Sequence, residues 1–149
     1  MAAGSSWAQG GEKGDENRKE RMAKLKRAFI EEELEMTAEE SEKFMPLYDK
    51  KEKDLMRIRV EMKEERKKGK KNEDMTEKEF LASVERVSEL RKEEVDVMED
   101  FLKSALPVLG LERTKKLPEL DKRFKMRLEQ RMKEREMDQR RQERPMDRD

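Results

Sequence analysis

Apolar residues at alternating four- and three-residue spacing cross residues 44–62 and set the strongest limit on the fold. Lys51 fills one step of this pattern, and its apolar members are Phe44, Tyr48, Leu55, Ile58 and Met62. A mean spacing of about 3.5 residues is that of an α-helix packed lengthwise against a second helix. The segment therefore predicts one long helix of a helical hairpin.

Two Thr-x-x-Glu motifs predict where helices begin. Thr37 is followed by Glu40, and Thr76 is followed by Glu79. In such a capping box the threonine hydroxyl accepts a hydrogen bond from the amide of the glutamate, and the glutamate carboxylate accepts one from the threonine amide. The motifs thus predict helices that start near residues 38 and 77.

Four helices and no strand are expected, near residues 17–35, 38–66, 77–105 and 112–135. The first helix carries the stripe Met22, Leu25 and Phe29. The third carries Phe80, Val84, Val87, Met98, Leu102 and Ala105, and the fourth carries Leu117, Leu120, Phe124 and Leu128. These stripes predict an all-α fold of two helical hairpins, the first helix with the second and the third with the fourth. The bundle should be elongated, with a kink or curve at Pro46.

The remaining segments have turn-forming or purely charged compositions. Residues 1–16 are predicted to be a flexible start, residues 67–72 a basic loop, and residues 136–149 a charged, disordered tail. Ser6 and Ala8 fit the small residues that precede a signal-peptide cleavage site. The chain is therefore expected in the periplasm or envelope if an apolar signal lies upstream, and in the cytoplasm otherwise.

Composition excludes most catalytic and metal chemistry. The 149 residues include neither Cys nor His, which removes thiolate nucleophiles, imidazole bases and the usual zinc ligands. Half of the residues are charged, so the core must be thin and leaves little room for a desolvated pocket. We expect no enzyme activity, no catalytic residue, no cofactor and no metal site. No apolar run is long enough to cross a membrane.

A nucleic-acid partner is also not expected. Lys and Arg together number 38, the same as Asp and Glu, and the chain holds one Trp and one Tyr. Proteins that bind nucleic acid usually combine a basic face with stacking aromatic residues. Here acidic segments flank the basic ones and would repel phosphate.

One stretch of sequence resembles a known family. Met36-Thr37-Ala38-Glu39, followed by Phe44-Met45-Pro46-Leu47-Tyr48, is similar to the opening motif of Spy/CpxP-like periplasmic helical proteins. The similarity is greatest to the Bacteroidetes type described as sensors of ECF-type sigma factors or as periplasmic heavy-metal sensors. The motif residues are Met36, Thr37, Glu39, Glu40, Phe44, Met45, Pro46 and Tyr48.

The resemblance extends over about residues 20–132 and implies a function. It implies an envelope-stress protein that binds unfolded or stress-exposed polypeptides without ATP, as a chaperone does. Two alternatives stay open: a regulatory or sensor partner in an ECF-sigma or envelope-stress pathway, and a passive coiled-coil structural protein. The metal-sensing relatives coordinate metal through His, which this chain lacks.

A second apolar strip on the second helix is the predicted contact surface. Met45, Met56 and Val60 lie about a third of a turn from the main stripe. Flexible Met side chains suit surfaces that bind varied polypeptides. Because the apolar content is low for a monomer of this length, we also expect a homodimer.

Overall fold

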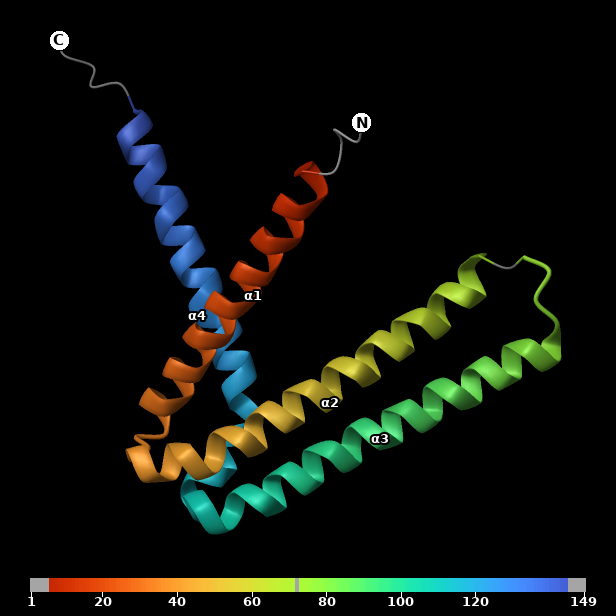
Figure 1. Cartoon of the computed structure of the whole chain (residues 1–149), viewed down its shortest axis with the longest axis horizontal. Coiled ribbons are helices and arrows are strands. Elements are labelled where there is room, and N and C mark those ends of the chain that lie inside the picture. The colour runs from red at the N-terminus through yellow and green to blue at the C-terminus, as the bar shows by residue number, and fades with distance from the viewer. Residues whose placement is uncertain (1–5, 72, 145–149) are drawn as a thin grey trace. The chain divides into compact units, whose positions relative to one another are not determined.

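Four α-helices make up the chain in this computed structural model, which describes residues 6–71 and 73–144 (Figure 1). They are α1 (Ser6–Glu33), α2 (Ala38–Lys71), α3 (Glu77–Leu109) and α4 (Leu111–Glu143). No strand occurs among these residues. The predicted all-α fold is confirmed.

The helices pair differently from the prediction. One compact unit spans Met36–Lys115 and holds α2, α3 and the first turn of α4. In the other, residues up to Glu35 combine with those from Lys116 onward, which brings α1 to α4. The expected pairing of the first helix with the second and the third with the fourth is therefore wrong. In Figure 1, α2 and α3 run side by side as one long hairpin.

Both predicted Thr-x-x-Glu motifs lie at helix starts, and both bonds of the capping box form at Thr37. The Thr37 hydroxyl accepts a hydrogen bond of 3.1 Å from the Glu40 amide, and the Glu40 carboxylate accepts one of 3.1 Å from the Thr37 amide. The Thr76 hydroxyl accepts a hydrogen bond of 3.2 Å from the Glu79 amide. These bonds satisfy amides that the first turn of a helix otherwise leaves unpaired.

The helices are longer than the sequence pattern predicted. α1 begins at Ser6 within the expected flexible start, and α4 reaches Glu143 within the expected disordered tail. The predicted 67–72 loop is helical up to Lys71. Straight-chain charged residues favour helix without any packing, and lysines in a last turn are stabilised by the helix dipole. Residues 1–5, 72 and 145–149 lie outside the described part of the chain.

α3 also extends past its predicted end near residue 105, and prolines lie inside both α3 and α4. Pro107 lies inside α3, which continues to Leu109 and ends at Gly110. Gly110 has a φ of +81°, a region that favours glycine, and its amide donates to the Leu106 carbonyl at 2.9 Å. Pro118 lies inside α4, which begins before it, at Leu111.

In the unit formed by the chain ends, α1 and α4 cross and then diverge (Figure 1). Phe29 packs against Phe124 with ring centroids 5.5 Å apart, and the Arg127 guanidinium lies over the Phe29 ring. Lys26 forms a salt bridge of 3.1 Å with Asp121. The predicted stripe residues Met22 and Leu25 are about half exposed, as the divergence of the helices leads one to expect.

Candidate functional site

The α2–α3 hairpin is held together by an aromatic cluster with a lysine inside it. Phe44 and Tyr48 of α2 lie 5.8 Å and 6.3 Å from the Phe101 ring of α3, centroid to centroid. The Lys51 ammonium lies 4.4 Å from the Tyr48 ring and 4.8 Å from the Phe101 ring. Lys51 is buried and its charge also pairs with Glu52 at 3.2 Å. Cation–π attraction thus stabilises a charged side chain at a buried position of the α2 stripe.

The α2 stripe is confirmed, whereas the predicted α3 stripe is mostly wrong. Phe44, Tyr48, Lys51, Leu55 and Ile58 are all buried, and the last member, Met62, is half-buried. On α3 the buried residues are Leu90, Phe101, Ala105 and Leu109, and only Ala105 belonged to the predicted stripe.

The rest of the predicted α3 stripe forms, together with Val95, a partly exposed apolar line. Phe80, Val84 and Val95 have exposed fractions of 57%, 48% and 64%. Together with Arg91 and three half-buried residues they make up what we call the α3 strip: Phe80, Val84, Val87, Arg91, Val95, Met98 and Leu102. Exposed Leu81 and Leu106 border it. A contiguous apolar surface of this kind marks a contact surface more often than an isolated exposed residue does.

The opposite flank of α3 is polar and already paired with α2. Arg57 bonds to Glu61 at 3.1 Å and to Glu93 at 2.6 Å, and Arg86 bonds to Glu61 at 2.6 Å. Hydrogen bonds from Arg86 and then Arg57 lower the pKa of Glu61. Because each helical residue turns by about 100°, Arg86 and Glu93 lie on the other side of α3 from the α3 strip. One face of the hairpin is thus closed by ion pairs, and the other is apolar.

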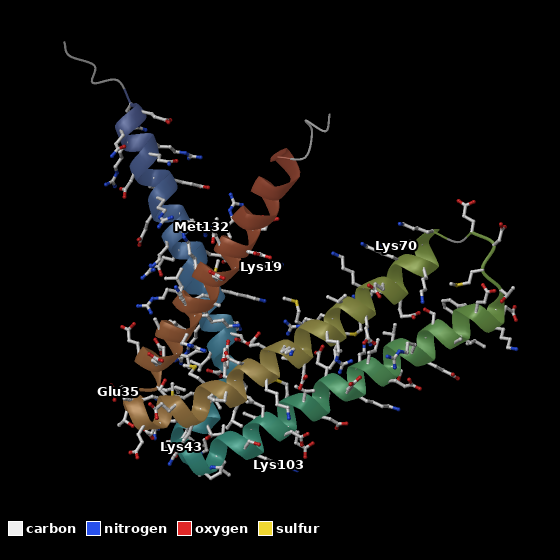
Figure 2. The ribbon with its side chains drawn as sticks, viewed as in Figure 1. Lys19, Glu35, Lys43, Lys70, Lys103 and Met132 are labelled. Atoms are coloured by element: carbon white, nitrogen blue, oxygen red, sulfur yellow. The ribbon has the colours of Figure 1, made fainter. Side chains whose placement is uncertain are left out.

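A groove of about 600 Å³ runs along the α3 strip at the far end of the hairpin. Its apolar lining includes Met75, Phe80 and Val84, and Arg66, Lys70 and Arg91 supply positive charge. Lys70, labelled in Figure 2, lies near the end of α2. A neighbouring groove of about 670 Å³ is lined mostly by charged residues. The apolar groove with a cationic edge is the better site for a polypeptide that carries both apolar and acidic side chains.

The three predicted contact residues do not share one exposed strip. Met45 is buried, with an exposed fraction of 6%, so its predicted role in an exposed strip does not fit the structure. Met56 and Val60 are exposed at 60% and 47%. By the turn of about 100° per residue, Met56 lies on the same side of the hairpin as the α3 strip, whereas Val60 lies further round α2, away from α3. Met56 extends that apolar face onto α2.

The residues of the family-like motif mainly build the hairpin. Phe44, Met45 and Tyr48 are buried, Met36 is half-buried, and Glu39 and Pro46 are exposed. Glu40 bonds to the Arg113 guanidinium through both carboxylate oxygens, one of them at 3.0 Å. The Arg113 hydrogen bond, with the Thr37 amide next in effect, lowers the pKa of Glu40 to about 2.

Residues 6–71 and 73–144 contain neither a clustered set of metal ligands nor a membrane-spanning helix. No group of three or more Asp or Glu side chains is placed to hold a metal ion. No helix is long and apolar enough to cross a membrane. Neither finding bears on what the chain binds.

Comparison with known proteins found no matching family model, no matching curated protein and no matching solved structure. The surface of the hairpin is therefore the feature that points to a function.

Sequence reasoning missed the α3 strip as a site because it placed Phe80 and Val84 in the core. The sequence nevertheless contains a pattern that indicates this strip. Leu90, Val97, Phe101 and Val108 form one apolar line along α3, and the α3 strip forms a second, about a quarter turn away. A single partner helix covers only one of two such lines, so the other line stays exposed.

Proposed function

We propose that this protein is a non-catalytic polypeptide-binding protein that captures unfolded or stress-exposed chains without ATP. Its place, in this proposal, is the cell envelope, and its resting form is a homodimer. The observation that carries the proposal is the partly exposed α3 strip with exposed Met56 beside it on α2. The resemblance of the 36–48 segment to Spy/CpxP-like proteins supports the same role.

The chemistry of the surface suits weak and varied capture. Valine, phenylalanine and methionine side chains hold a client by burying apolar area, which requires no defined sequence. Arg66, Lys70 and Arg91 at the groove attract acidic segments and raise the rate of encounter. Because the surface is open and elongated, it fits an extended or helical segment rather than a small molecule.

The test is light scattering from a chemically denatured client diluted with and without this protein. The parent protein should lower the scattering at several-fold molar excess, with no nucleotide present. The variant carrying Val84→Glu and Val95→Glu should lose this effect, because it places two charges on the apolar strip. Added salt should weaken capture in part, since exposed charges are screened beyond about 8–10 Å at physiological ionic strength.

A matched control separates the strip from net charge. Ala82 and Ser104 are exposed on α3 but lie outside the strip. The variant with Ala82→Glu and Ser104→Glu has the same charge change on the same helix and should suppress scattering like the parent. Equal scattering with and without the parent protein would contradict the proposal and favour the sensor alternative, in which one defined partner uses this face.

A further inference from the structure

The α3 strip has the same spacing when followed from either end. Its seven positions, from Phe80 to Leu102, are separated by four, three, four, four, three and four residues, and Arg91 is the central one. The mean step of about 3.7 residues is close to that of a straight helix, so the strip stays on one face over about 33 Å. A line with this symmetry can pack against an antiparallel copy of itself.

We propose that a second copy of this chain covers the α3 strip, with the two α3 helices antiparallel and a two-fold axis at Arg91. In this register Phe80 lies opposite Leu102 of the second copy, and Val84 lies opposite Met98. Each contact occurs twice, as a two-fold interface requires. Both pairs join one larger and one smaller or more flexible side chain, which helps them fill the space between the helices.

Charge complementarity selects the second copy as the occupant. One half of the strip borders the groove whose cations include Arg66, Lys70 and Arg91. The other half is flanked by Glu94 and by Glu99, whose carboxylate also forms a salt bridge of 2.8 Å with Lys103 of the same helix. An antiparallel pair places the acidic half of one copy on the cationic half of the other. Glu94 of the second copy then lies about one turn from Arg91, within the reach of its long side chain, which offsets the approach of the two Arg91 charges.

The inference deepens the proposed function, on which it rests in one respect: client and second copy would use the same strip. Self-pairing therefore covers the α3 strip while no client is bound. A client must compete with the second copy, so capture should be strongest at protein concentrations where the pair dissociates.

Engineered cysteines test the register directly. The chain has no Cys, so an introduced thiol can pair only with its own kind. Arg91→Cys places two thiols at the two-fold axis and should give a covalent dimer upon oxidation. Val84→Cys alone should not, because two copies of residue 84 lie about 21 Å apart along the helices, beyond disulfide reach. A mixture of Val84→Cys and Met98→Cys chains should give mainly the mixed dimer.

Several outcomes would overturn the inference. In the first, neither Arg91→Cys nor the mixture of Val84→Cys and Met98→Cys chains forms a cross-link. In the second, Val84→Cys alone cross-links as readily as Arg91→Cys. Sedimentation of the parent as a 17.9 kDa monomer at high micromolar concentration would do the same. The mixed pair keeps Arg91 in place, so it remains informative if Arg91→Cys is poorly folded.

The light-scattering assay keeps the two proposals apart. Oxidised Arg91→Cys dimer should lose client suppression, and reduction should restore it. If the parent suppresses aggregation but no register-specific cross-link forms, the self-pairing is wrong and the proposed function stands. If the cross-links form as predicted and no form of the protein suppresses aggregation, the pairing stands and the proposed function is wrong.

Discussion

Arg113 donates hydrogen bonds to the carboxylate of Glu40, a residue 73 positions earlier in the sequence, and the same carboxylate accepts a hydrogen bond of 3.1 Å from the Thr37 amide. The capping box at the start of α2 is thereby joined to the first turn of α4, within the unit 36–115. One glutamate thus both starts a helix and attaches it to a distant segment.

This pair predicts a loss of stability in acid. The pKa of Glu40 is lowered from 4.5 to about 2 in the folded protein. A carboxyl group with a lowered folded pKa adds stability that is complete above its unfolded pKa and disappears as pH falls through the folded value. Glu40→Gln should therefore melt below the parent at pH 7, and the difference should vanish near pH 2. Melting curves across this range measure it, with the exposed neighbour Glu39→Gln as the control.

The caps predict a second stability effect. Thr76→Ala removes the acceptor for the Glu79 amide and should lower the free energy of unfolding by about 1 kcal/mol, with a comparable loss for Thr37→Ala. Urea unfolding measures both. Ser88→Ala, an exposed change in the interior of α3, is the control and should have little effect. Parent-like curves for both threonine variants would show that these hydroxyls do not cap the helices.

The burial of Lys51 predicts that removing its charge and removing its aliphatic stem change the free energy of unfolding by different amounts. Lys51→Met keeps the buried stem and should change the free energy of unfolding by less than about 1.5 kcal/mol. Lys51→Ala removes three methylenes of the stem and should cost about 2 kcal/mol, at about 0.8 kcal/mol for each buried methylene. Chemical denaturation compares the two. Equal losses would mean that the ammonium over the Tyr48 and Phe101 rings, rather than the stem, stabilises the hairpin.

The division of α3 into a buried line and an exposed strip predicts opposite responses to truncation. Leu90 is fully buried, so Leu90→Ala should cost about 2–5 kcal/mol. Val95 is largely exposed, so Val95→Ala should stay within about 0.5 kcal/mol in dilute protein. Thermal unfolding of both variants at low concentration provides the measurement. A large loss at Val95 in the dilute monomer would place it in the core.

Sequence reasoning predicted the buried face of α2 well because the regular four- and three-residue spacing from Phe44 to Ile58 has a single interpretation. Phe44, Tyr48, Leu55 and Ile58 occupy the core as predicted, and the two Thr-x-x-Glu motifs gave the starts of α2 and α3. Capping depends on neighbours in the sequence, which makes it visible without a structure.

The predicted core face of α3 and the predicted helix pairing were wrong because residue spacing alone does not show which helix packs against which face. α3 carries two apolar lines, and which of them faces α2 depends on the fit of Leu90 and Phe101, not on spacing. The pairing of α1 with α4 rests on contacts such as Phe29 with Phe124, which no local pattern reveals. Met45 shared the hydrophobicity of Met56 and Val60, but it is buried.

The division of the chain into units also sets the order in which they can form during synthesis. The unit 36–115 is continuous, so α2 and α3 can pair as soon as they have left the ribosome. The partner of Phe29 is Phe124, and at about 5–20 residues per second it is made about 5–20 s later. Throughout that interval α1 has an unburied aromatic face and no α4 to cover it. During this interval the newborn chain exposes an aromatic face that α4 covers in the folded protein.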